Sequence, residues 1–172
     1  MWGLIPNRLK NYNNHKFMNK LFEHLKLREG YKQSVYLDVL GKPTCGIGHL
    51  LSKEERKKYP VKSLVPKRII DEWFKKDVAT ALNASTKQME LLELKNDNFK
   101  IALVSVNYQL GASWHKKFPA TWKLLKAKHY DDAIKELLYK NPPDVEPSTW
   151  TEQTPVRVKD FVEAIDKLKG EM

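Results

Sequence analysis

The chain has one cysteine, no long apolar run and fewer acidic than basic residues. Cys45 has no second cysteine to pair with, which excludes an intrachain disulfide and favours a reducing compartment. No apolar stretch approaches the roughly 18 residues of a transmembrane helix, so we expect no membrane span. The segment Met1–Pro6 is too short for the hydrophobic part of a secretory signal. We therefore expect a protein that stays in a cytoplasm until another protein releases it.

The composition predicts one folded domain with a basic surface. A chain of 172 residues, of which 41% are hydrophobic, has enough material for a real core. Its 31 Lys and Arg against 21 Asp and Glu give a net charge of +10. Such an excess favours a polyanionic partner, either nucleic acid or the anionic polymers of a bacterial envelope, unless the basic surface serves only solubility. The five histidines are scattered, with no metal-ligand spacing and no internal repeat, so we expect neither metal nor cofactor.

The stretch from Leu25 to Leu51 contains two carboxylates that are suited to acid–base chemistry. Glu29 precedes Gly30, a natural helix stop, at the end of a helical pattern that begins at Phe17. Asp38 lies in the alternating run 35–39, which is typical of a strand or hairpin. Two carboxyl groups on different elements can face each other across a gap, where one donates a proton and the other activates water. The alternative is that Glu29 is an ordinary solvated residue at a helix end.

The returning strand expected at 44–48 contains Gly46 and Gly48. A glycine inside a strand often marks a close approach of another group to the backbone, so both residues are candidates for the floor of a groove. The alternative is a pair of ordinary hairpin glycines. A dinucleotide-binding loop is rejected, because no long strand–helix–strand unit follows.

His49 and Asp77 are polar residues in apolar surroundings. Asp77 falls on the apolar face of a helix that Pro66 opens, four residues after Trp73, where a carboxylate needs a partner. We expect His49 to be that partner in a structural pair. A catalytic histidine is the less favoured alternative, because no Ser or Cys nucleophile has a recognisable setting, and Cys45 is interpreted as a small core residue.

The remainder of the chain predicts helices joined by short connections. Thr154 followed by Pro155 indicates an N-cap with proline at the first helical position. A proline-rich loop is expected at 141–149. The expected helical segments share apolar residues at helical spacing and are 99–110, 119–125, 130–139 and 154–168.

Several motifs in this order resemble the phage-type lysozymes, glycoside hydrolase family 24. The candidate residues Glu29, Asp38 and Thr44 are separated by nine (38 − 29) and six (44 − 38) positions, the intervals of that family's Glu–Asp–Thr catalytic set. The resemblance covers about 19–169. The motifs that follow in the family's order are Gly46-Ile47-Gly48-His49-Leu50-Leu51, Phe74-x-x-Asp77-Val78, Tyr108-Gln109-Leu110-Gly111 and Trp150-x-x-Gln153-Thr154-Pro155-x-Arg157.

The resemblance implies an α+β, mainly α fold of two lobes. Residues 1–16 would be an N-terminal extension, and 17–172 a single lysozyme-like catalytic domain. The small β-hairpin lobe would cover about 30–64 and the linking helix about 66–85. The larger helical lobe would take about 86–172 together with the helix 17–29.

The resemblance also implies an inverting muramidase that hydrolyses the β-1,4 bond between N-acetylmuramic acid and N-acetylglucosamine in peptidoglycan. Glu29 would protonate the leaving oxygen, Asp38 would act as base or electrostatic partner, and Thr44 would hold the attacking water. The saccharide-contact positions of this site would be Leu50, Tyr108, Thr121 and Glu136. Its supporting residues would be His49, Asp77, Gln109, Gln153 and Arg157. Arg157 would point at Glu29.

The biological role that this resemblance implies is that of an endolysin that lyses a bacterial host. We expect a monomer in the host cytoplasm, released through a holin-like pore to the periplasm and cell wall, where its positive charge holds it on the anionic envelope. The alternatives are a tail-associated phage lysozyme and an inactive wall-binding module on the same fold. Nucleic acid is not an expected partner, because the chain has no recognisable groove-reading motif.

Overall fold

The computed structural model describes residues 7–171, with side chains described from residue 14 onward. Residues 1–6, the first part of the expected N-terminal extension, and residue 172 lie outside the described residues. The chain forms two compact units, Met1–Phe74 and Lys75–Met172, and the boundary falls inside one long helix.

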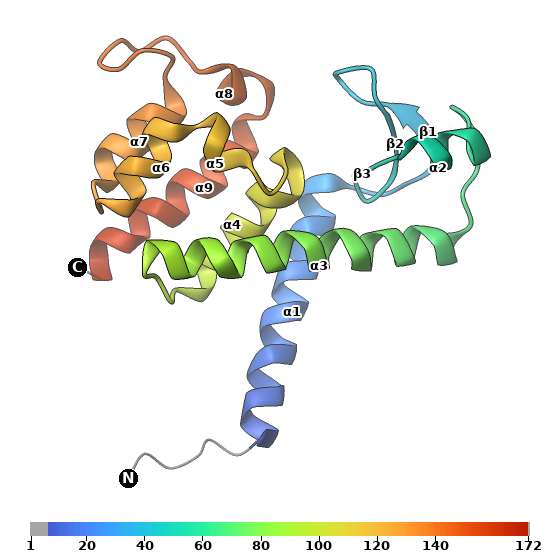
Figure 1. Cartoon of the computed structure of the whole chain (residues 1–172), viewed down its shortest axis with the longest axis horizontal. Coiled ribbons are helices and arrows are strands. Elements are labelled where there is room, and N and C mark those ends of the chain that lie inside the picture. Colours follow the sequence, from blue (N-terminus) through green and yellow to red (C-terminus); the bar gives the residue numbers. More distant parts are fainter. Residues whose placement is uncertain (1–6, 172) are drawn as a thin grey trace. The chain divides into compact units, whose positions relative to one another are not determined.

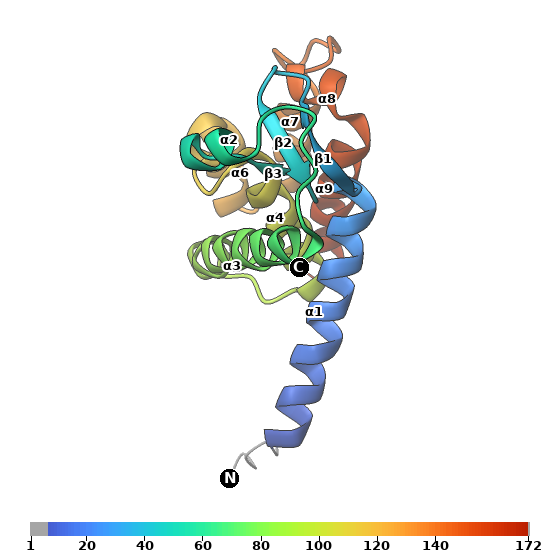
Figure 2. The ribbon, with the colours of Figure 1, turned by 90° about the vertical axis from the view of Figure 1, so that its right-hand side faces the viewer.

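The first unit combines a helix with a small antiparallel sheet (Figure 1). The sheet has the order β1-β2-β3, and a second view shows β1 beside β2 (Figure 2). In sequence order the elements are α1 (Asn7–Glu29), β1 (Lys32–Leu37), β2 (Pro43–Gly46), β3 (His49–Leu50), α2 (Lys53–Lys58) and the start of α3 (Lys67–Leu92).

The sheet is held by backbone pairing on both sides of β1. Tyr36 of β1 lies opposite Thr44 of β2, and the segment 62–65 pairs along the other edge through the Ser34–Leu64 bridge. The inward residues form a small core with side chains of the first turns of α3, and its buried members are Val35, Cys45, Leu51, Val65 and Ile70. The alternation of β1 thus puts Val35 inside and leaves Tyr36 on the other face.

The second unit is a helical body around one large apolar core. Trp114, Phe99 and Phe161 are fully buried there, and α7 packs against both α6 and α9. The elements after α3 are α4 (Asp97–Leu110), α5 (Trp114–Lys117), α6 (Pro119–Lys126), α7 (Tyr130–Leu138), α8 (Thr149–Gln153), α9 (Pro155–Leu168) and the 3₁₀ turn η1 (Lys169–Glu171).

The predicted class, α+β and mainly α, is confirmed, but two helices are longer than expected. α1 begins at Asn7 rather than Phe17, because its first turns lack the apolar periodicity from which a helix is recognised. α3 continues past Ser85 to Leu92. Ser85 and Gln88 are buried polar residues on this helix, and they interrupt the apolar stripe that marks a core-facing side in sequence.

Thr154 corrects the expected N-cap. It stands at the cap position of α9, but its side chain makes no capping hydrogen bond. Its hydroxyl instead donates to the Trp150 carbonyl at 3.2 Å, which ties α9 to the preceding helix α8. Within residues 7–171, no helix has both the length and the apolar composition to cross a membrane.

Candidate active site

Glu29 is the last residue of α1, and the chain leaves the helix at Gly30. Gly30 has a φ of +70°, and its amide donates to the Lys26 carbonyl at 2.9 Å, which closes the last turn. The Glu29 side chain is partly buried. The helix end therefore holds this carboxylate at a defined place in the first unit.

Gly48 makes room for the Glu29 carboxylate. A Cβ atom at Gly48 would lie 2.5 Å from Glu29 Oε2, and the backbone φ of +65° also favours glycine. Gly48 lies in the turn after β2, which ends at Gly46, and not in the expected strand 44–48. The close approach expected there is confirmed, and the group that approaches is the candidate acid. Gly46 is packed in the same way, because its Cβ would lie 2.7 Å from Ile70 Cγ2.

Asp38 lies in the turn just after β1, one residue beyond the strand that the alternation predicted to contain it. Its Oδ1 accepts hydrogen bonds from the amides of Leu40 at 2.9 Å and Lys42 at 2.8 Å. These bonds fix the carboxylate from within the hairpin. Because both go to Oδ1, the other oxygen is the one available to a water molecule.

Thr44 stands on β2 of the same hairpin and is 5% exposed. Its hydroxyl donates to the Lys42 carbonyl at 3.0 Å, so towards any further partner Oγ1 acts as an acceptor. Such an oxygen can accept a hydrogen bond from a water molecule. Asp38 and Thr44 are therefore positioned by contacts to the same residue, Lys42.

Tyr36 is a residue of this site that the sequence analysis missed. Burial, followed by the negative charges of Glu29 and Asp38, raises the pKa of the Tyr36 phenol. The phenol thus lies in the field of both candidate carboxylates and stays neutral, while Lys32 Nζ lies 4.2 Å from its ring centroid. The sequence feature that could have identified Tyr36 is the two-residue period of the expected strand 35–39, which puts Tyr36 on the same face as Asp38.

His49 has a partner that the sequence did not suggest. Its Nε2 lies 2.8 Å from Glu55 Oε2, and its ring stacks on Trp73 with centroids 4.4 Å apart. Burial raises the pKa of Glu55, but hydrogen bonds from His49 and Ser52 outweigh burial and leave that pKa below its usual value. Glu55 also completes a capping box with Ser52 at the start of α2. The pair with Asp77, a residue of the second unit, stays a prediction.

The other residues expected around the site belong mostly to the second unit. Gln109 links two helices there, because its Oε1 accepts from Trp150 Nε1 and its Nε2 donates to Thr154 Oγ1, both at 3.3 Å. Arg157 donates to the backbone and hydroxyl oxygens of Ser105, both at 3.1 Å. The contact of Arg157 with Glu29 stays a prediction.

The expected saccharide contacts differ in exposure. Leu50 on β3 is 47% exposed, whereas Thr121 on α6 is buried, with 2% exposed. Tyr108 on α4 and Glu136 on α7 are intermediate. Gln153, one of the expected supporting residues, is exposed at the end of α8. These contact assignments stay predictions.

Cys45 is unsuited to nucleophilic chemistry. It is fully buried in the sheet core, and burial raises the pKa of its thiol, an effect that a hydrogen bond to the Gly46 backbone only partly offsets. Among the described residues no group of three or more His, Cys, Asp or Glu side chains is placed to hold a metal ion.

Comparison with known proteins places this arrangement in a family. The model of the phage lysozyme family matches residues 26–142, which include Glu29, Asp38 and Thr44. The chain belongs to the phage lysozyme family. As a member of this family it falls in the lysozyme class of glycoside hydrolases, the muramidase-type enzymes that degrade peptidoglycan.

Two relatives of this phage lysozyme family member come from the amoeba Dictyostelium discoideum. A probable T4-type lysozyme 2 is 32% identical over 160 residues, which are 81% of this chain and 89% of that protein. A probable T4-type lysozyme 1 is 28% identical over 169 residues, 87% of this chain and 95% of that protein. The similarity thus extends over most of the length of all three chains.

Proposed function

We propose that this protein hydrolyses the β-1,4 bond between N-acetylmuramic acid and N-acetylglucosamine in peptidoglycan, with Glu29 as the acid. The observation that carries the proposal is the placement of two carboxylates on different elements of the first unit. Glu29 ends α1 against Gly48, Asp38 is fixed in the hairpin turn, and both act on the phenol of Tyr36. Unlike surroundings allow one carboxyl group to give a proton while the other accepts one.

The proposed reaction is a single displacement. Glu29 gives its proton to the glycosidic oxygen as the bond from that oxygen to the anomeric carbon breaks. A water molecule, held by the Thr44 hydroxyl, attacks the anomeric carbon from the opposite face, and Asp38 takes its proton. Proton exchange with solvent then returns Glu29 to the acid form and Asp38 to the carboxylate.

An inverting outcome is part of the proposal. Inversion requires room for a water between the two carboxyl groups, which are then about 6.5 to 9.5 Å apart, whereas retention requires about 5 Å. The anomeric form of the first product, followed by NMR immediately after cleavage, tests this step. Formation of the β anomer first would reject inversion and with it the assignment of Asp38 as a base.

We further propose that the saccharide is contacted by Leu50, Tyr108, Thr121 and Glu136, and that the enzyme acts as an endolysin. In that role it would accumulate in the host cytoplasm and reach the wall through a holin-like pore. The intact pair of carboxylates argues against an inactive wall-binding module. A tail-associated lysozyme remains the alternative, and detection of the protein in purified virions would favour it.

Clearing of permeabilised bacteria tests the assignment of the acid. Glu29→Gln keeps the size of the side chain but removes the proton donor, so we expect turbidity loss to slow by about 10²- to 10⁴-fold. Glu23→Gln is the matched control, because Glu23 is an exposed residue of the same helix. Equal clearing by Glu29→Gln and wild type would defeat the proposed acid. Reducing-end analysis of the products identifies the sugar at the cleaved bond.

A further inference from the structure

The second unit contains a pocket of about 550 Å³ between the later turns of α3 and the segment that follows α4. Its lining includes two lysines, Lys87 and Lys116, and no carboxylate. Neutral donors and acceptors complete the polar part of its wall, namely Thr80, Asn83, Ser113 and His115. Such a lining carries positive charge that nothing in the pocket wall neutralises.

The floor of this pocket is rigid. Gln88 donates from Nε2 to Asn107 Oδ1 at 3.0 Å and to the Ala112 carbonyl at 3.2 Å, and its Oε1 accepts from Trp114 Nε1 at 3.1 Å. These bonds use the Gln88 amide fully, so it shapes the pocket but has no donor left for a ligand. The Thr80 hydroxyl donates to the Lys76 carbonyl at 3.1 Å and so can only accept from a ligand. The donors that remain for a ligand are those of the two lysines, Ser113, Asn83 and the histidine.

His115 lines this pocket. Its Nδ1 is buried, with no hydrogen-bond partner among the described residues, and its ring packs on Trp122 with centroids 4.8 Å apart. Burial, followed by the neighbouring charge of Lys116, lowers the pKa of His115. The ring is therefore neutral at neutral pH. Since a buried N–H without an acceptor is costly, the proton belongs on Nε2, which makes Nε2 a donor.

Lys116 of the pocket is also the first of several lysines that follow one another closely in the sequence. Residues 112–129 contain five lysines and no Asp or Glu. We call these five residues the lysine stretch: Lys116, Lys117, Lys123, Lys126 and Lys128. All five are exposed. Within the part of the chain that the structure describes, none of them forms an ion pair. Lys116 belongs to both the pocket and the stretch, whereas Lys128 lines a second pocket.

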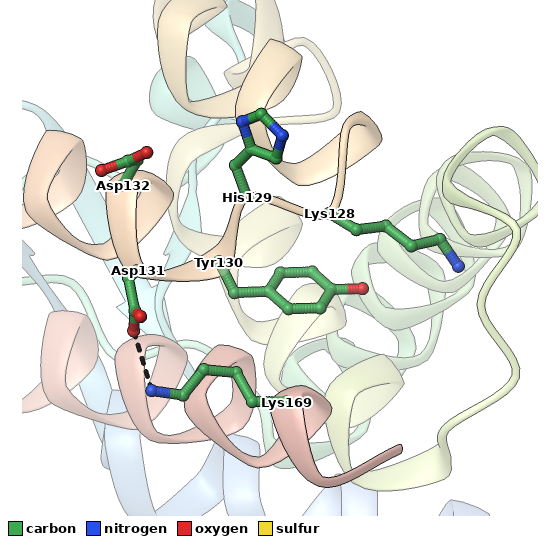
Figure 3. A pocket seen from close by; sticks show the side chains of 6 residues that line it. All are labelled: Lys128, His129, Tyr130, Asp131, Asp132 and Lys169. Carbon is green, nitrogen blue, oxygen red and sulfur yellow. Dashed lines mark hydrogen bonds and ion pairs between the residues drawn. The ribbon is translucent and has the colours of Figure 1, made fainter. Parts of the chain in front are cut away.

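A second pocket in this unit, of about 350 Å³, differs in charge (Figure 3). Asp131 and Asp132 line it, and the dashed line in Figure 3 marks the bond from Lys169 Nζ to Asp131, 2.7 Å long. Lys169 also pairs with Asp166 at 2.8 Å. Its charge is therefore neutralised within the protein. Lys128 of the lysine stretch also lines this pocket, but the two carboxylates make it a poorer site for an anion than the pocket at Lys87 and Lys116.

We propose that the pocket at Lys87 and Lys116, together with the lysine stretch, binds a polyol-phosphate chain, the phosphodiester polymer type of bacterial walls. Lysine ammonium groups are point charges that suit phosphate, the Ser113 hydroxyl and the His115 N–H can donate to phosphate oxygens, and the Thr80 hydroxyl can accept from a polyol hydroxyl. The extended lysine stretch favours a polymer over a single phosphate. The choice of a wall polymer rests on the proposed function, because such a polymer lies beside the peptidoglycan substrate.

Nucleic acid fits this surface less well. Single-stranded nucleic acid is usually held by aromatic rings on which its bases stack. The aromatic residues of 112–129 are Trp114, Phe118 and Trp122, and all three belong to or pack against the core of the second unit. The stretch therefore offers charge without a stacking platform.

Binding of a synthetic oligo(glycerol phosphate), measured by fluorescence anisotropy at two salt concentrations, tests the proposal. The protein used is full-length Glu29→Gln, so that hydrolysis does not interfere. Lys87→Gln with Lys116→Gln is expected to weaken binding about tenfold and to reduce its salt dependence. The matched control, Lys75→Gln with Lys76→Gln, removes the same charge from exposed positions of α3 outside the pocket and should change affinity less than about twofold.

Three outcomes would overturn the proposal. An equal loss in both double variants would mean that net charge alone is responsible. Equally tight, pocket-dependent binding of a single-stranded oligonucleotide of the same charge would assign the site to nucleic acid. Equally tight binding of inorganic phosphate would assign it to the free ion.

The same proteins separate this proposal from the proposed function. Wild-type enzyme that clears cells but does not bind the oligomer would reject the phosphate site and leave the muramidase assignment intact. Pocket-dependent binding without any hydrolysis by wild type would support the site and reject the proposed function.

Discussion

The hairpin of the first unit and the polar core of the second unit use hydrogen bonds in opposite ways. In the hairpin, Asp38 bonds through Oδ1 only, and Thr44 spends its proton on a backbone carbonyl, so each keeps an oxygen for a water molecule. In the second unit, Asn107 donates to Ser85 Oγ, Gln88 Oε1 and the Leu103 carbonyl and accepts from Gln88 Nε2. A network closed in this way favours stability, whereas atoms left open favour chemistry.

The largest expected effect is on activity and comes from the hairpin, where Asp38 and Thr44 keep oxygens open to water. Asp38→Asn should lower the clearing rate by about 10²-fold or more, because the amide cannot take a proton from water. The midpoint of thermal unfolding should hardly change, since the amide oxygen still accepts from Leu40 and Lys42. Asp38→Ala is the variant to compare with it, because alanine removes both the base and the hydrogen bonds that fix the turn. It should lower both the clearing rate and the unfolding midpoint. A normal rate for Asp38→Asn would remove Asp38 from the mechanism.

The hydrogen-bond network around Asn107 in the second unit should affect stability and leave activity unchanged. Asn107→Ala leaves buried groups of Gln88 and Ser85 without partners, and we expect the free energy of unfolding to fall by about 2 to 4 kcal/mol. Activity per folded molecule, measured well below the unfolding midpoint, should stay near that of wild type. Asn98→Ala, at an exposed position of the same helix, is the control and should change stability by less than about 0.5 kcal/mol. Loss of activity without loss of stability would contradict the comparison.

Alanine substitutions at Gly48 and Gly41 separate the effect of the Gly48–Glu29 contact from the effect of backbone strain. Gly48→Ala places a Cβ against the Glu29 carboxylate, so we expect about a tenfold lower rate from displacement of the acid. It should also cost about 1 to 2 kcal/mol of stability, because the backbone φ is positive. Gly41→Ala has a similar φ, +76°, but nothing within 4 Å of its Cβ. Gly41→Ala should therefore lose stability while keeping most of its activity, and equal losses of rate would refute the contact.

The smallest expected effect is the contribution of Glu55 to stability in acid. Its pKa lies below the ordinary value of 4.5, mainly because hydrogen bonds from His49 and Ser52 outweigh the effect of burial. The folded protein thus binds fewer protons than the unfolded chain, so this contribution is present above about pH 4.5 and is lost as the pH falls through the lowered pKa. Unfolding midpoints across this range should fall less steeply for Glu55→Gln than for wild type. Parallel curves would show that the His49–Glu55 pair contributes nothing in solution.

Several features followed from local sequence alone. Apolar spacing and the positions of Pro119 and Pro155 predicted α6 and α9, and Gly30 predicted the end of α1. The order and intervals of Glu29, Asp38 and Thr44 predicted the lysozyme family. These features are local because helix periodicity, proline geometry and turn glycines act within a few residues of the chain.

Tertiary structure decided which polar groups meet. The sequence placed polar residues at Ser85, Gln88 and Asn107 without showing that they bond to one another across α3 and α4. It also did not suggest Glu55 as a partner of His49, because that contact depends on how β3 and α2 are folded together. It also did not show that the Glu29 carboxylate rests on Gly48. Backbone propensities act between neighbouring residues, but hydrogen bonds and charges act through space, so only the fold determines their partners.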